Sequence, residues 1–362
     1  MNTVKKYIVG ISAALIMVFG AYTAYGAEDS LDIEKVAIKA IQYSTEVKAK
    51  ASAADLTLDR YGKDLHVTNA WSASSVIYAP LNAQYQIDLS YGDLQITESS
   101  VRLSAYQHYI TMLKNKYKVE LQQKFVDKLT IENEDAENKL KSGGISEYDA
   151  GMIAANLAKE RITLKKYQRS YDADVINLNK VMGEPVLNKY ANFIDQNIKP
   201  SATLRPLEDY IQAGLASRYE VTSAESSLEV TKVRQAIEAP DKSQSMPLDY
   251  YQATTQYDLA QGQNEIAKAR IQVELDLTSG YSELESRLRT WENTKILLES
   301  AQSDYDLVKQ NYDLGRAGKD ELITAEKDYM EAQIQVKNAE LDAWLFQMKM
   351  ELASGIGPGI SQ

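Results

Sequence analysis

The sequence has no cysteine in its 362 residues. This absence excludes disulfides, thiolate metal sites and a catalytic cysteine, and also a lipid anchor attached to an N-terminal cysteine. Basic residues are in the minority, since 40 Lys and Arg stand against 51 Asp and Glu and give a net charge of −11. Because proteins that bind nucleic acids need clustered Lys and Arg, this acidic balance argues against a nucleic-acid partner.

Proline is also scarce, with seven residues in the chain. Proline is costly inside a helix, so its clusters predict breaks, and the proline-free stretches 81–184 and 248–357 predict long helices. The predicted breaks lie at Pro185, Pro200 and Pro206 and again at Pro240 and Pro247.

One long apolar run stands at the N-terminus. Lys5 and Lys6 precede an apolar segment over 7–19, and small residues follow it. This order predicts a secretory signal peptide over residues 1–26. The run is short for a membrane span, and no later stretch is apolar enough for a transmembrane helix. We therefore expect an exported protein, whose net charge becomes −13 when the two lysines are removed (−11 − 2).

The first half of the mature chain predicts a helical hairpin. Residues 97–141 and 146–182 are rich in good helix formers, and their apolar residues recur at helical spacing. Gly143 and Gly144 separate the two runs, and Gly183 ends the second. Two helices joined by a tight turn form an antiparallel hairpin, and forty-odd residues span roughly 60 Å. This length predicts a rod rather than a globule.

The second half repeats this pattern. Helical runs over 266–314 and 320–353 flank a turn that contains Gly315 and Gly318. One constant offset maps the first copy onto the second (318 − 144, 321 − 147 and 357 − 183). It pairs Gly144 with Gly318, Glu147 with Glu321, and Gly183 with Gly357.

Shorter helical stretches, over 31–58 and 205–237, open the two halves at the same offset. We therefore predict an internal duplication, with one repeat over 27–200 and another over 201–362. The fold class is mainly α, with two tandem copies of a long antiparallel helix hairpin and shorter helices.

The connectors 60–96 and 238–265 are less regular. Residues 85–92 alternate between apolar and polar, which is a weak strand signal, whereas 238–265 has little strand character.

Residues 312–325 read YDLGRAGKDELITA. This stretch resembles the hairpin turn of the TolC family of outer-membrane efflux ducts, in which an aromatic residue and a glycine precede an acidic residue and an Ala-rich helix. Residues 144–150 of the first copy form a matching turn, and the openings of the copies, at 40–41 and 214–215, are similar to the family's opening helix. The resemblance covers residues 31–357.

The resemblance implies a homotrimer whose long helices form a hollow periplasmic α-helical cylinder. It implies a passive conduit in the outer membrane with no catalysis and no cofactor, which works with a periplasmic adaptor (membrane-fusion) protein and an inner-membrane pump. Usual members of the family also insert two strands per copy into the membrane. Such a strand takes about 9–11 residues, so the connectors predict reduced or absent barrel strands.

By this resemblance, four acidic residues would line an aperture at the hairpin tips: Glu147, Asp149, Asp320 and Glu321. Rings of carboxylates concentrate cations. The alternative role is helix capping, since acidic side chains favour a helix N-terminus.

Tyr312 and Arg316 complete the aperture residues that the resemblance implies. The family often has a basic residue two positions after the turn glycine, where this chain has Ala317, so the adjacent Arg316 is the substitute. Tyr312 has hairpin packing as its alternative role. The resemblance assigns adaptor docking to the turn glycines, namely Gly143, Gly144, Gly315 and Gly318.

Other functions remain as alternatives to the duct. The main one is an exported coiled-coil spacer of the cell envelope without a channel. An adaptor subunit would have one hairpin and β-rich flanks, unlike this chain. An enzyme is the weakest interpretation, because the sequence has no phosphate loop, GxSxG or HExxH motif. His66 and His108 are far apart in the pattern, so we expect no metal site.

Overall fold

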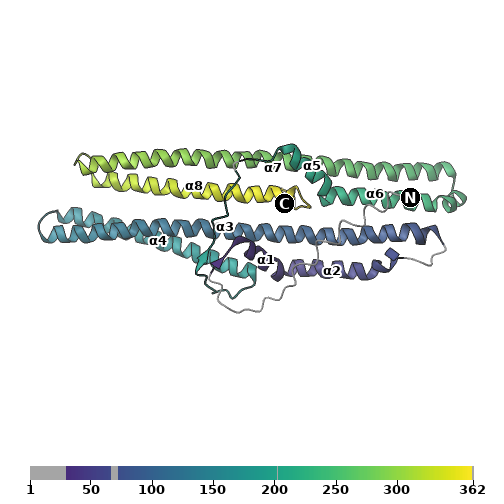
Figure 1. Cartoon of the computed structure of the whole chain (residues 1–362), viewed down its shortest axis with the longest axis horizontal. Coiled ribbons are helices and arrows are strands. Elements are labelled where there is room, and N and C mark those ends of the chain that lie inside the picture. The colour runs from purple at the N-terminus through teal and green to yellow at the C-terminus, as the bar shows by residue number, and fades with distance from the viewer. Residues whose placement is uncertain (1–29, 67–71, 202, 361–362) are drawn as a thin grey trace.

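A computed structural model describes residues 30–66, 72–201 and 203–360, and the predicted signal peptide lies outside them. The described chain is a long, narrow layer of helices (Figure 1). None of its described helices combines the length and the apolarity that crossing a bilayer requires.

The first half is built around one long helix. It consists of α1 (Ile33–Tyr43), α2 (Thr45–Tyr61), a 3-10 helix η2 (Gly62–His66), a π-helical turn η3 (Ser74–Tyr78), α3 (Ala79–Lys141) and α4 (Glu147–Met182). α3 has 63 residues and is about 95 Å long. α2 packs along the beginning of α3 and α4 along its end, so two shorter helices cover one long helix.

The second half has the same plan. It consists of α5 (Leu207–Ser217), α6 (Tyr219–Ser245), α7 (Leu248–Asp313) and α8 (Lys319–Ala353). α6 packs along the beginning of the 66-residue α7, and α8 packs along its end. The predicted runs 146–182 and 320–353 are confirmed to within one residue by α4 and α8.

The four hairpin helices lie in the order α7, α8, α3 and α4 (Figure 1). α8 packs against α3 and joins the two hairpins, whereas α4 and α7 lie at the edges of the layer. Both hairpins point the same way, so the α3–α4 and α7–α8 turns lie at one end of the rod and the α6–α7 turn lies at the other (Figure 1).

Two breaks divide the shorter helices, at Ser44 and at Arg218, and their separation equals the predicted repeat offset (218 − 44). Ser44 ends α1, and its hydroxyl accepts a hydrogen bond from the N–H of Val47 at 3.3 Å, which caps α2. Arg218 ends α5 and precedes α6. Each of the predicted helical stretches 31–58 and 205–237 is therefore divided between two helices.

A core at the middle of the rod holds the N-terminal segment. β1 (Ser30–Leu31) and β2 (Asn192–Phe193) form a two-residue parallel pair. The hydroxyl of the buried Tyr109 on α3 hydrogen-bonds to the carbonyl oxygens of Leu31 and Ile194 at 2.8 and 2.9 Å. One buried tyrosine therefore fixes both short strands to the longest helix of the first half.

The weak strand prediction over 85–92 is wrong, because these residues lie within α3. Ala83 and Ile87 are one helical turn apart and both are buried, so the apolar residues here follow helical spacing. The long helices begin at Ala79 and Leu248, both well before the predicted starts and by the same margin (97 − 79 and 266 − 248). Helices therefore fill most of both connectors.

The predicted break at Pro240 is also wrong, because α6 continues through it. Proline removes one helical hydrogen bond, but packing against a neighbouring helix can offset that loss. The hydroxyl of Tyr251 on α7 donates to the carbonyl of Gln235, near this proline, at 3.0 Å. The break lies instead at Met246 and Pro247, immediately before α7.

Candidate functional site at the hairpin tips

The first tip turns through Gly143, whose φ is +74°. The N–H groups of Gly143 and Gly144 donate to the carbonyls of Leu140 and Lys139 at 3.0 and 2.7 Å. This pair of bonds is a Schellman motif, which satisfies the last carbonyls of α3 and needs a left-handed residue at its centre. Glycine takes that conformation without steric cost.

The second tip uses the same motif. Gly315 has a φ of +69°, and its N–H donates to the carbonyl of Tyr312 at 2.9 Å. The N–H of Arg316 donates to the carbonyl of Asn311 at 2.8 Å. The turn glycines Gly143 and Gly315 are therefore structural equivalents.

The repeat register at the tips differs from the predicted one. Gly143 matches Gly315, and the residue before α4, Ser146, matches the residue before α8, Gly318 (315 − 143 and 318 − 146). This offset is smaller than the one at the helix breaks (218 − 44), so the second copy reaches its tip sooner. The predicted pairings of Gly144 with Gly318 and of Glu147 with Glu321 are therefore wrong at this point. Gly318 matches Ser146, and Glu147 begins α4 whereas Glu321 is the third residue of α8.

All four predicted acidic residues lie in the first turns of α4 and α8 and are exposed. Asp149 has a clear capping role. The Ser146 hydroxyl accepts from the N–H of Asp149 at 3.1 Å and hydrogen-bonds to its carboxylate at 2.6 Å. Gly318 provides no side chain for the corresponding position, so the carboxylates of Asp320 and Glu321 act on the α8 N-terminus through charge alone.

Tyr312 contacts a residue that sequence reasoning missed. Its ring lies 5.4 Å from the ammonium of Lys319, and that ammonium is 2.9 Å from a carboxylate oxygen of Glu132 on α3. This chain of contacts connects the second tip to the first hairpin. Lys319 lies within the turn stretch 312–325, but no local pattern marks it as the partner of Glu132, because their pairing depends on how α8 packs against α3. The cation over the Tyr312 ring is thus Lys319, and within the described part of the chain Arg316 makes no side-chain hydrogen bond or ion pair.

Further ion pairs join the hairpins behind the tips. Lys327 on α8 lies 2.8 Å from Glu160 of α4, whose buried carboxylate also accepts from the amide of Gln122 at 3.0 Å. Lys128 on α3 pairs with Glu326 on α8. Burial lowers the pKa of Lys128, but the hydrogen bond and charge of Glu326 outweigh it and leave that pKa raised. Charged pairs therefore hold the two tips in register with each other.

The two edges of the layer are apolar in places. Exposed large apolar side chains are concentrated on the edge helices, whereas α8 has none, and α7 has no buried residue between 285 and 313. On α4 they are Tyr148, Met152 and Ile162, and on α7, away from both of its ends, they are Ile271, Leu275, Ile296, Leu297 and Leu307.

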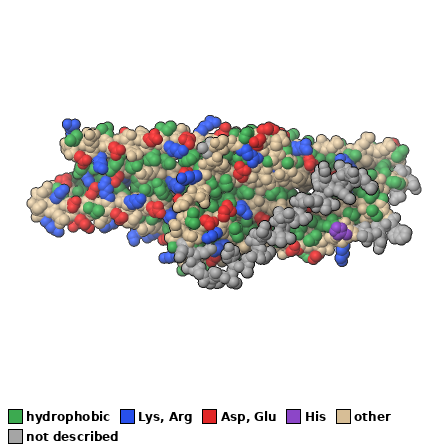
Figure 2. Space-filling model, viewed as in Figure 1, with side chains coloured by type: hydrophobic (Ala, Val, Ile, Leu, Met, Phe, Trp, Pro, Cys, Tyr) green, Lys and Arg blue, Asp and Glu red, His purple; other side chains and the backbone are tan. Residues whose placement is uncertain are grey.

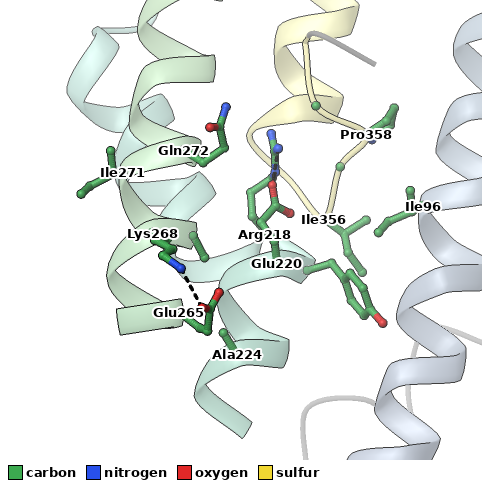
Figure 3. Close-up of a pocket in the computed structure, with 14 residues that line it drawn as sticks. Ile96, Arg218, Glu220, Ala224, Glu265, Lys268, Ile271, Gln272, Ile356 and Pro358 are labelled. Atoms are coloured by element: carbon green, nitrogen blue, oxygen red, sulfur yellow. Dashed lines mark hydrogen bonds and ion pairs between the residues drawn. The ribbon is translucent and has the colours of Figure 1, made fainter. Parts of the chain in front are cut away.

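A cavity of about 800 Å³ lies at the α5–α6 break, between the two halves (Figure 3). Arg218 lies in it, buried, and pairs with Asp276 at 3.1 Å and with Glu220. On the opposite wall Lys268 pairs with Glu265 at 2.8 Å (Figure 3). The charges of the cavity are thus matched among themselves, and Arg218 also donates to the Ala353 carbonyl at the end of α8. This arrangement suits a joint between helices better than a ligand site.

No protein-family model and no curated protein matches this sequence. The folded chain, however, is similar to solved structures of outer-membrane proteins, two of them described as channels, along nearly its whole length.

VceC, an outer membrane protein of Vibrio cholerae, has a TM-score of 0.63 and 11% identity, over 90% of this chain and 96% of VceC. The CmeC outer membrane channel of Campylobacter jejuni has a TM-score of 0.61 and 11% identity, over 91% of this chain and 87% of CmeC. The MtrE outer membrane channel of Neisseria gonorrhoeae has a TM-score of 0.59 and 12% identity, over 93% of this chain and 94% of MtrE. The fold implied by the resemblance to the TolC family is therefore confirmed for the single chain.

Proposed function

We propose that this chain is a subunit of a TolC-like efflux duct in the outer membrane. Three copies would form a passive conduit without catalysis, served by a periplasmic adaptor and an inner-membrane pump. The observation that carries this proposal is the match to the CmeC and MtrE outer membrane channels over 91% and 93% of this chain. We also infer that residues 27–200 and 201–362 are two tandem repeats, which supply the two hairpins of each subunit.

The free edges of the layer support closure by further copies. A single helix layer leaves both faces in water, and its edge helices lack a neighbour on one side. Ile162 on α4 and Ile296 on α7 are exposed, and they lie at similar distances from their own tips (162 − 147 and 313 − 296). Each is thus about 25 Å from its own tip, so α4 of one copy and α7 of the next would bury apolar residues in the tip half of the rod.

The hairpin tips are the aperture in this proposal. Glu147, Asp149, Asp320 and Glu321 would recur three times around the axis and form a carboxylate-lined opening. Tyr312 and Arg316 lie beside that opening, and the turns at Gly143, Gly144, Gly315 and Gly318 would present the surface to an adaptor.

Cross-linking in the outer-membrane fraction tests the proposal. The chain has no cysteine, so Ile162→Cys combined with Ile296→Cys supplies the only two thiols. A short bismaleimide should link the double variant into a covalent trimer. Each single variant should give no such ladder, because it lacks the facing thiol.

A control replaces Ile131 on α3, which is exposed in the same tip half of the rod but does not lie on an edge helix. Ile131→Cys with Ile296→Cys should stay monomeric under the same conditions. A soluble monomer for the Ile162→Cys and Ile296→Cys variant would contradict the duct and favour the coiled-coil spacer.

A further inference from the structure

The end of the rod opposite the tips exposes apolar side chains from both halves. In the first half they are Val76 and Ile77 in η3, and in the second half they are Leu248 and Tyr250 at the start of α7. Each has 52–62% of its surface exposed. η3 contacts α6, so the two pairs occupy one end of the molecule.

The two stretches that carry these side chains are poor in charge, in contrast to the first tip, and the nearest charges lie on η2 and at the end of α6. Between residues 243 and 264 the chain has two charged residues, Asp249 and Asp258, whereas the equally long stretch 128–149 around the first tip has nine. Residues 72–87 have none, although 25% of the whole chain is charged. Red and blue side chains are accordingly frequent on the visible face of the tip half in Figure 2.

Tyrosine replaces charge at this end. Tyr78, Tyr85, Tyr250, Tyr251 and Tyr257 all lie in these charge-poor stretches. Tyr250 and Tyr257 are exposed, and the other three are partly exposed. Tyrosine is enriched where a protein meets the boundary between lipid and water, because its ring is apolar and its hydroxyl stays hydrated.

We propose that this helical end is a lipid-contacting surface, and that Val76, Ile77, Leu248 and Tyr250 insert into the boundary region of a bilayer. The contact is apolar and aromatic rather than electrostatic, because residues 243–264 contain no Lys or Arg and both of their charges are acidic. The proposal deepens the proposed function, since it assigns the duct's membrane contact to helix ends. The lipid contact itself depends only on these exposed side chains.

A second copy of the chain is a less suitable occupant of this end. The exposed apolar residues that suit closure by copies run along the edges of α4 and α7. The residues at the end belong to η3 and to the start of α7, which come from different halves and meet at the terminus of the rod. A terminal surface suits a planar partner that lies across the axis.

A single-thiol probe tests the proposal with the mature chain. Tyr250→Cys carries an environment-sensitive fluorophore as the only thiol, and Tyr148→Cys is the matched control, because Tyr148 is an exposed tyrosine at the opposite end. With vesicles of phosphatidylcholine alone, the label at 250 should shift to the blue and brighten, and the label at 148 should stay unchanged. High salt should not reverse the effect.

A second variant checks affinity. Val76→Ser, Ile77→Ser, Leu248→Ser and Tyr250→Ser together should lower the partition into phosphatidylcholine vesicles at least about tenfold in flotation. All four sites are exposed, so the helical circular dichroism should be retained. The comparison variant Leu187→Ser, at an exposed apolar site outside the helices, should float like the unaltered chain.

Several results would overturn the lipid surface. The fluorescence of the label at 250 could stay unchanged, shift equally with that of the label at 148, or shift only with anionic lipid. A shift without vesicles that grows with protein concentration would show that another copy covers this end. Cross-linked trimers without vesicle binding would overturn this inference and keep the duct. Vesicle binding by a chain that forms no trimer would keep this inference and overturn the duct.

Discussion

At the two hairpin tips the chain turns through a glycine in a left-handed conformation, with nothing within 4 Å of the position a Cβ would take. Gly143→Ala and Gly315→Ala should therefore cost only backbone strain, about 1–2 kcal/mol each in the free energy of unfolding. Gly151 in α4 is the control, because its φ is not positive and its surroundings are equally open. Gly151→Ala should cause no loss of stability in urea, because alanine favours a helix interior over glycine. Equal losses at all three positions would contradict this account.

Arg218 gives a prediction about buried charge. Its side chain and that of Asp276 are 4% and 6% exposed and lie 3.1 Å apart. Arg218→Met should cost about 3–5 kcal/mol, because it removes a partner of a buried carboxylate. Arg289→Met at the exposed pair with Glu285 should cost less than about 1 kcal/mol. Chemical denaturation of both variants measures the difference. Similar losses in the free energy of unfolding would show that the buried pair stabilises the protein no more than the exposed pair does.

Between helices, the contact of α3 and α4 with α8 is what makes two hairpins into one layer. Lys327→Met should destabilise the protein by about 2 kcal/mol, because the Glu160 carboxylate keeps Gln122 but loses its cation. Adding Glu160→Gln should recover at least about half of that loss, since no buried charge then remains. A double variant that is less stable than the Lys327→Met variant would show that the pair does not act as a unit.

The sequence predicts the helices where their spacing and glycines are local signals, and it fails where packing decides. The ends of α4 and α8 follow from Gly143, Gly183 and the glycines near 315, because a turn or a cap depends on a few adjacent residues. The beginning of α3 cannot be predicted in this way, because the pattern over 85–92 is compatible with a strand or with a helix. The packing of α2 against α3 decides for the helix. The pair of Lys319 with Glu132 joins the second half of the sequence to the first, so no local pattern contains it.

Across the whole molecule, exposed side chains of different kinds are grouped on different surfaces. Apolar residues are exposed along the edges α4 and α7, charges gather at the tips, and tyrosines replace charges at the opposite end. Each of these three surfaces suits a different neighbour, namely another copy, an aqueous opening with its adaptor, and lipid. A layer one helix thick cannot cover its own edges, so its composition of 24 Tyr against 4 Phe fits side chains that pack and still face water.

The acidic tips acquire their proposed role only in the assembled duct, where Asp320 and Glu321 would recur in three copies. Asp320→Asn with Glu321→Gln should then lower the preference for cations over anions severalfold, as read from the reversal potential in a planar bilayer under a KCl gradient. The effect should fade toward 1 M salt, where the screening length falls to about 3 Å. The control Asp55→Asn with Asp59→Asn removes the same charge from exposed sites on α2, far from the tips, and should leave selectivity unchanged.

Losing first-turn carboxylates should also weaken α8 by about 0.3–1 kcal/mol each. If that loss of stability occurs while the reversal potential stays constant, Asp320 and Glu321 cap the helix and do not line an aperture.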